Sequence, residues 1–123
     1  MPRAPAVDFI ATTANSIDGY DVVQTLGIVR GVVVRSRSVV GKIGVTLQTL
    51  LGGNISLLEE LCERTRGDAY AKAVEHSIGL GGNALVAMRY DATEIMSGVS
   101  EVLCYGTAVR IAPRLRRSTE ESI

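Results

Sequence analysis

The order of apolar and polar positions predicts two strands in the first third of the chain. A short apolar run covers residues 8–13, and a longer β-branched stretch follows over residues 20–35. In an extended strand Gly27 and Gly31 lie on the same side. Because glycine weakens the interior of a strand, two glycines on one face predict a bend or the close approach of another backbone.

A long helix is predicted to begin at Ser56, whose hydroxyl can cap the first turn while Glu59 occupies the partner position of a capping box. Its apolar stripe recurs at helical spacing and consists of Leu58, Leu61, Cys62, Thr65, Ala69, Ala73 and Leu80. Glycines at 79, 81 and 82 end the helix, and one of them is expected to adopt the left-handed cap conformation. Similar spacing predicts a shorter helix over residues 39–51.

Residues 84–95 and 99–111 predict two further strands that form a hairpin. A turn centred on Ser97 places Tyr90 opposite Cys104, on an apolar face suited to the long helix. The opposite face carries the predicted pairs Arg89–Tyr105, Asp91–Leu103 and Leu85–Val109. The predicted fold class is therefore α+β, a two-layer sandwich in which one long helix covers an antiparallel sheet.

The face away from the helix retains an apolar patch that a monomer of this size rarely exposes. A second copy of the chain is the simplest cover for it, so the sequence predicts an oligomer. An alternative is that the helix predicted over residues 39–51 folds over this face within one chain. The residues predicted to form the interface between copies are Leu85, Arg89, Asp91, Leu103, Tyr105 and Val109.

Length and charge limit the classes of function. A chain of 123 residues with 46% apolar residues fits a single domain over residues 1–123. Its ordered core is expected over about 8–112, with a charged, flexible tail over 113–123. Acidic and basic residues number 13 each and are interspersed, which argues against nucleic acid and membrane surfaces as partners. No apolar run reaches the length of a signal peptide or a membrane span, so a cytoplasmic location is expected.

Few side chains offer reactive chemistry. Cys62 and Cys104 are expected to be free thiols, and they are the weak candidates for a metal site because the helix could bring them together across the sheet. Burial would favour their packing as small hydrophobic residues instead. The single histidine, His76, is expected near the C-terminal end of the helix, where the helix dipole explains it without catalysis. We therefore predict no catalytic residues and no cofactor.

Three stretches of the chain resemble the YbjQ-like family, whose members are often described as heavy-metal-binding domains. They are Ile17-Asp18-Gly19-Tyr20 with the glycine-containing strand that follows, Leu51-Gly52-Gly53-Asn54-Ile55 with the long helix, and Gly82-Asn83-Ala84 continuing through Arg89-Tyr90-Asp91 to the segment from Glu101 to Val109. The resemblance covers roughly residues 8–112. Leu58 replaces a common tyrosine, Val32 an acidic residue and Gly82 an alanine.

The resemblance implies a dodecin-like, two-layer subunit that assembles into a ring-forming oligomer, a homopentamer. It transfers architecture better than function, since the role of the family is itself unsettled. The leading hypothesis is a non-enzymatic cytoplasmic ring protein that binds a small ligand or a partner. The alternative is a heavy-metal-binding domain that holds a divalent or heavy-metal ion through Cys62 and Cys104 or through ligands from several subunits. An uncharacterised enzyme ranks third.

Overall fold

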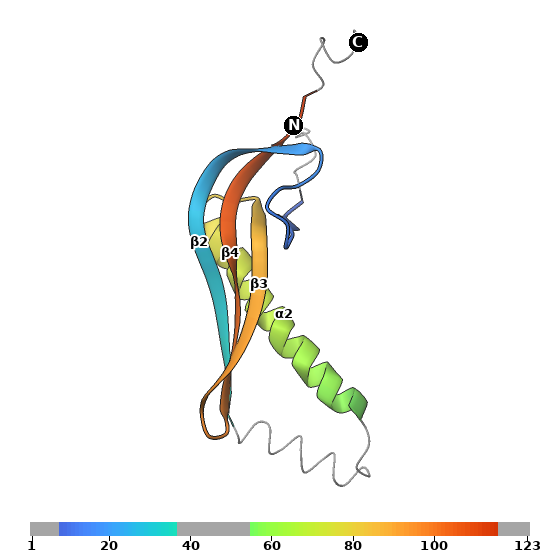
Figure 1. Ribbon diagram of the computed structural model, residues 1–123, viewed down its shortest axis with the longest axis vertical. Helices are drawn as coiled ribbons and strands as arrows, with labels where there is room; N and C mark the ends of the chain where they lie inside the picture. Colours follow the sequence, from blue (N-terminus) through green and yellow to red (C-terminus); the bar gives the residue numbers. More distant parts are fainter. Residues whose placement is uncertain (1–7, 37–54, 116–123) are drawn as a thin grey trace, which may run out of the picture.

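A computed structural model describes residues 8–36 and 55–115, so the helix predicted over 39–51 lies outside the described residues. The elements are β1 (Ile10–Ala11), β2 (Tyr20–Ser36), α2 (Ile55–Gly79), β3 (Ala84–Met96) and β4 (Val99–Pro113). The strands form one sheet in the order β1-β3-β4-β2, and α2 crosses one of its faces (Figure 1). No helix within these ranges combines the length and apolar character needed to cross a membrane.

The α+β class and the single covering helix are confirmed, but the sheet is mixed. Strand β4 pairs with both β2 and β3 in antiparallel fashion, whereas β1 pairs with β3 in parallel through Ile10 opposite Ala84 and Ala11 opposite Leu85. The prediction of a wholly antiparallel sheet is wrong at this point. A strand of two residues carries too little alternation to reveal its direction or its neighbour.

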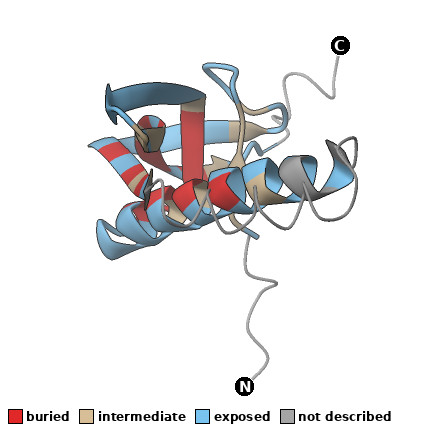
Figure 2. Ribbon diagram, turned by 90° about the horizontal axis from the view of Figure 1, so that it is seen from below, coloured by how far each residue is buried: buried red, intermediate tan, exposed pale blue. Residues whose placement is uncertain are grey.

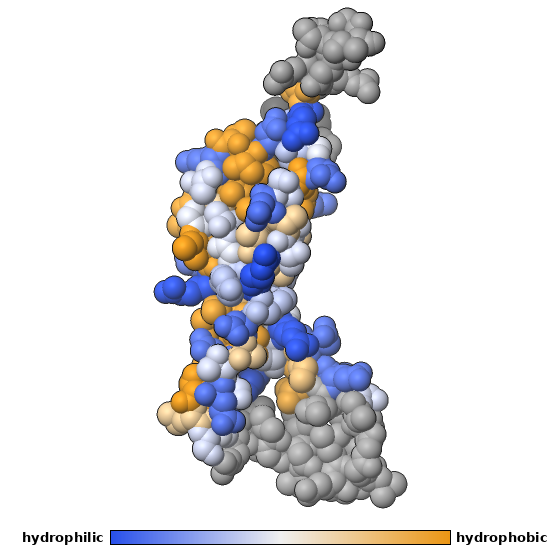
Figure 3. Space-filling model, viewed as in Figure 1, coloured by the Kyte–Doolittle hydropathy of each residue, from blue (hydrophilic) through white to orange (hydrophobic). Residues whose placement is uncertain are grey.

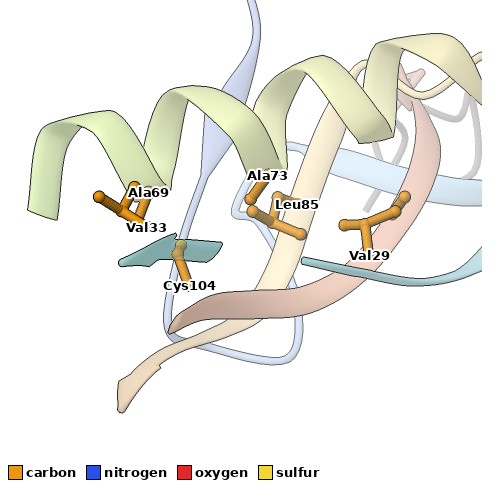
Figure 4. Packing of buried hydrophobic residues seen from close by; sticks show 7 residues of the cluster. Val29, Val33, Ala69, Ala73, Leu85 and Cys104 are labelled. Atoms are coloured by element: carbon orange, nitrogen blue, oxygen red, sulfur yellow. The ribbon is translucent and has the colours of Figure 1, made fainter. Parts of the chain in front are cut away.

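Helix α2 lies close to the sheet because small side chains face each other there. Thr65, Ala69, Ala73 and Ser77 recur every four residues and are all buried (Figure 2). On the sheet side, a Cβ atom added to Gly31 would overlap the carbonyl oxygen of Ala69 and lie 2.6 Å from the Ala73 nitrogen. The expected close approach of another backbone is confirmed at this glycine. Around the contact pack Val29, Val33, Leu85 and Cys104 (Figure 4).

The glycines after the helix provide the cap that the sequence predicted. Gly81 has a φ of +93°, in the left-handed region that favours glycine. The Gly82 nitrogen donates to the Ser77 carbonyl at 2.9 Å, and the Gly81 nitrogen donates to the Ile78 carbonyl at 2.9 Å. These two bonds define a Schellman motif, which satisfies the last carbonyls of α2 and turns the chain into β3.

The hairpin register is as predicted from Arg89 to Glu94 and differs by one residue on either side, at Met96 next to the turn and before Arg89. Tyr90 pairs with Cys104 and Asp91 with Leu103, as expected. A β-bulge between Val86 and Arg89 then shifts the pairing, and Ala87 within it has a φ of +54°. The nitrogen of Ala87 donates to the Ala14 carbonyl at 2.8 Å, so the N-terminal segment holds the bulge in place.

The shift moves Leu85 to the other face of the sheet. Leu85 pairs with Ala108 instead of Val109 and is fully buried beneath α2. Val109 is 2% exposed in a second cluster with Ile111, over which Ile17 and Tyr20 pack. The expectation that Leu85 and Val109 lie exposed for a second copy is therefore wrong. The bulge turns the Leu85 side chain to the helix side of the sheet, and the N-terminal segment of the same chain covers Val109.

Substitution of Gly31 tests the close contact of α2 with the sheet. We expect Gly31→Ala to lower the free energy of unfolding by about 3 kcal/mol, because its Cβ meets helix backbone that cannot rotate away. Gly67→Ala is the matched control: nothing lies within 4 Å of a Cβ there, and alanine should raise helix stability by about 1 kcal/mol. Urea unfolding followed by circular dichroism measures both. Equal effects of the two substitutions would contradict this packing.

Candidate functional site

The described surface has a hollow on the helix side of the sheet and a groove on the opposite face. The helix-side hollow has a volume of about 360 Å³ and is lined by Arg35, Leu61, Cys62, Thr65, Arg66, Tyr90, Asp91, Ala92, Ser100 and Val102. The outer groove has a volume of about 300 Å³ and is lined by Ile28, Arg30, Asp91, Leu103 and Tyr105. Each is therefore close to the lower end of the size range of small-molecule sites, about 300–1,000 Å³.

The outer groove brings together part of the predicted interface. Leu103 and Tyr105 of β4 pair with Asp91 and Arg89 of β3, and all four lie on the face away from α2. This face is mixed in character, with hydrophobic residues among charged ones (Figure 3). The Arg89 guanidinium donates to the Thr13 carbonyl at 2.8 Å, so it fixes the N-terminal segment to β3.

Strand β2 contributes to the same face, which the sequence analysis did not identify. Ile28 is 75% exposed and Val34 is 49% exposed, while Val32 between them pairs with Leu103. The sequence could have indicated this. If Gly27 and Gly31 face the helix, the even-numbered apolar residues of β2 must face away from it, because side chains alternate along a strand. The apolar surface is therefore wider than the hairpin alone.

Side chains of α2 bind the outer edge of β2, the last strand of the sheet. The Lys72 ammonium donates to the Val32 carbonyl at 3.2 Å, and the Nδ1 atom of His76 accepts the Arg30 backbone N–H at 3.3 Å. These hydrogen bonds satisfy backbone C=O and N–H groups at the edge of the sheet, which would otherwise be available to pair with another strand. His76, placed in the last turn of α2 as expected, thus has a structural partner.

The helix-side hollow forms where α2 departs from the sheet toward its N-terminal end (Figure 1). Its apolar wall comes from Leu61 of the helix and from Ala92 and Val102 of the hairpin. Two arginines add charge at this end. Arg35 pairs with Asp68 at 2.9 Å, and Arg66 pairs with Glu63 one helical turn away at 3.5 Å.

Tyr90 adds a phenol to the helix-side hollow. Burial is the main cause that raises the pKa of this phenol, and the nearby Cys104, Tyr70 and Glu63 raise it further, while Arg66 opposes them. A raised pKa keeps the hydroxyl protonated well beyond neutral pH. Tyr90 therefore offers a hydrogen-bond donor as well as an aromatic surface.

The two cysteines occupy different environments. Cys62 is exposed at the helix-side hollow, whereas Cys104 is buried in the core cluster that contains Ala69. The two thiols therefore differ in their access to solvent, and only Cys62 lines the hollow. Within residues 8–36 and 55–115 no group of three or more His, Cys, Asp or Glu side chains could hold a metal ion.

The difference between the cysteines predicts two rates of thiol modification. Burial hides the Cys104 thiol from reagents and also raises its pKa, and each of these effects slows the reaction of that thiol. We expect a disulfide reagent such as Ellman's to label one thiol per folded chain rapidly and a second only on unfolding. Cys62→Ser should abolish the rapid phase, and Cys104→Ala should leave it intact; the reverse assignment would contradict the burial described here.

Comparison with known proteins shows relatives along most of the chain. UPF0145 proteins of Burkholderia thailandensis and Burkholderia mallei are each 60% identical to it over 101 residues, which cover 82% of this chain and 91% of the relative. A crystal structure of a protein of unknown function from Pediococcus pentosaceus has the same fold, with a TM-score of 0.54 and 16% identity over 85% of this chain and 98% of that one.

A family model agrees with these relatives. The YbjQ model, described as "Putative heavy-metal-binding", matches residues 9–112, which include all the described elements up to the last residue but one of β4. The resemblance seen in the sequence is thereby confirmed, and the chain belongs to the YbjQ family, which also contains the UPF0145 proteins.

Proposed function

We propose that this protein is a non-enzymatic, cytoplasmic subunit of a homo-oligomeric ring, and that the assembled ring binds a small ligand or a protein partner. The observation that carries the proposal is the apolar face formed by β2 and β4 around the outer groove. Ile28, Val34 and Tyr105 are 75%, 49% and 37% exposed there. Exposed large apolar side chains gathered on one face are typical of interfaces between protein chains.

The charges on this face support contact between copies of one chain. Arg30 and Asp91 both line the outer groove, so one surface presents a cation and an anion beside an apolar centre. A neighbouring copy could place its own apolar residues in the groove and pair with either charge at the rim. A ring requires such a contact to be heterologous, with two different patches of the chain meeting at each junction. The pentameric stoichiometry rests on the family resemblance.

The proposed lack of catalysis rests on the positions of the titratable side chains. His76, the only histidine in the sequence, uses its Nδ1 atom to hold the edge of β2. The Asp91 carboxylate accepts a hydrogen bond at 2.9 Å from the next backbone nitrogen, that of Ala92. Both contacts are structural, and this favours a binding or scaffolding role over proton transfer.

Leu103→Lys tests the proposed interface. A lysine at this position would place a charge at the centre of the contact between copies, while the facing Asp91 could accept it within the monomer. We expect the oligomer to dissociate into folded monomers, with at least a tenfold rise in the dissociation constant. Sedimentation velocity measures the mass, and far-ultraviolet circular dichroism checks that the helix content is retained.

Ile78→Lys is the matched control. Ile78 is 56% exposed on α2, on the opposite layer of the molecule, and a basic residue near the end of a helix is electrostatically favourable. It should leave the mass unchanged. A wild-type chain that sediments as a monomer at all concentrations, or a Leu103→Lys variant that remains assembled, would overturn the proposal.

The second candidate function is metal binding, which the description of the family favours. Since Cys104 is buried and Cys62 exposed, we infer that such a site would use Cys62 from several subunits rather than both cysteines of one chain. Native mass spectrometry with zinc or cadmium should then show fewer than one ion per chain, lost in Cys62→Ser and retained in Cys104→Ala. Binding that survives Cys62→Ser would exclude this form of the site.

A further inference from the structure

The helix-side hollow is a candidate ligand site that is built by a single chain. Its wall of Leu61, Ala92 and Val102 is apolar, and polar side chains stand around that wall: Arg35, Thr65, Arg66, Tyr90, Asp91 and Ser100. In a small-molecule site the apolar wall contributes affinity, and the polar groups fix the orientation of the ligand. The volume of about 360 Å³ suits a small ligand.

The two arginines of the hollow are differently held. Arg35 comes from the end of β2, is 27% exposed, and is fixed by its 2.9 Å ion pair with Asp68 of α2. That pair engages the Nη2 atom, and a guanidinium has five N–H donors, so donors remain for a ligand. Arg66 pairs only loosely with Glu63, and both side chains are more than half exposed, so little stability is lost if Arg66 turns to a ligand.

The balance of charge selects among anions. Arg35 and Arg66 face three carboxylates nearby, since Asp91 lines the hollow and Asp68 and Glu63 are the ion-pair partners. A dianion such as a phosphate monoester would add two charges to a region that is already slightly acidic. A carboxylate adds one charge and can accept two parallel hydrogen bonds from one guanidinium.

We propose that the helix-side hollow binds a small amphipathic carboxylic acid, with its carboxylate at Arg35 and Arg66. Its apolar body, aliphatic or aryl, lies against the wall formed by Leu61 and Val102. Tyr90 is one of the lining residues, and its hydroxyl can donate a further hydrogen bond to the carboxylate. This site shares Asp91 with the outer groove, but its arginines and its apolar wall are on the helix side of the sheet, outside the proposed interface.

Titration of the full chain with octanoate tests the site. We expect saturable binding of one octanoate per chain, at least tenfold tighter than 1-octanol and tighter than octyl phosphate, measured by isothermal titration calorimetry. In the same samples, chemical-shift changes in the methyl groups of Leu61 and Val102 locate the ligand. Sedimentation of these samples reports the oligomeric state separately, so failure of this site and failure of the proposed ring are distinguishable.

Variants separate the charge from the cavity. Arg66→Gln should weaken the binding of octanoate about tenfold and leave the binding of 1-octanol unchanged. Ala92→Leu should weaken the binding of both ligands, because the larger side chain fills part of the hollow. Arg114→Gln is the matched control, because that arginine also forms an exposed ion pair, with Asp21 at 3.1 Å. It should bind octanoate as the wild type does.

Three results would overturn the proposal. Octanol that binds as tightly as octanoate would show that the arginines do not recognise the ligand. Tighter binding of octyl phosphate would make the ligand class wrong. Shift changes confined to residues other than Leu61 and Val102 would place the ligand elsewhere, and this readout on the wild-type chain holds even if Ala92→Leu fails to fold.

Discussion

The contact between the backbone of α2 and Gly31 determines the arrangement of the rest of the molecule. At that point the Ala69 carbonyl and the Ala73 nitrogen lie where a side chain of β2 would otherwise be, so helix and sheet approach more closely than ordinary side chains allow. Toward its N-terminal end, α2 carries Leu61 and faces Val102, which need more room than alanine and glycine. One close contact at the centre and larger side chains at one end make the helix diverge, and the helix-side hollow is the result.

The other face of the sheet is divided by the β-bulge at Ala87. Hydrogen bonds from the Ala87 and Met88 nitrogens to the N-terminal segment hold that segment against β3. The segment continues to Ile17 and Tyr20, which pack over Val109. Among the described residues, the chain thus covers one end of its outer face and leaves Tyr105 partly exposed at the other end. The proposed contact with a second copy would therefore use the outer groove and the adjacent residues of β2.

Much of the fold follows from the pattern of residues, because long elements repeat their signal many times. The start of α2 was predicted within one residue, and the hairpin register from Tyr90 to Thr93 follows from a short turn between two strands. The bulge did not follow, since it depends on hydrogen bonds from Ala87 to a segment about 70 positions earlier in the chain. A single residue of slippage then reversed the face assigned to Leu85, which is the known weakness of register arguments.

The candidate sites were less predictable than the fold because they depend on where α2 ends its contact with the sheet. The stripe that contains Cys62 and Ala69 is continuous in sequence, yet Thr65, Ala69 and Ala73 are buried whereas Cys62 is exposed. Cys62 therefore differs from the buried Cys104, and Arg35 and Arg66 both line one hollow. Because successive side chains of β3 and β4 point to opposite faces, Tyr90 and Val102 line that hollow, whereas Leu103 lines the outer groove. Two surfaces of different chemistry thus share the same pair of strands: Asp91 lines both, whereas a substitution at Tyr90, Val102 or Leu103 changes the lining of one of them.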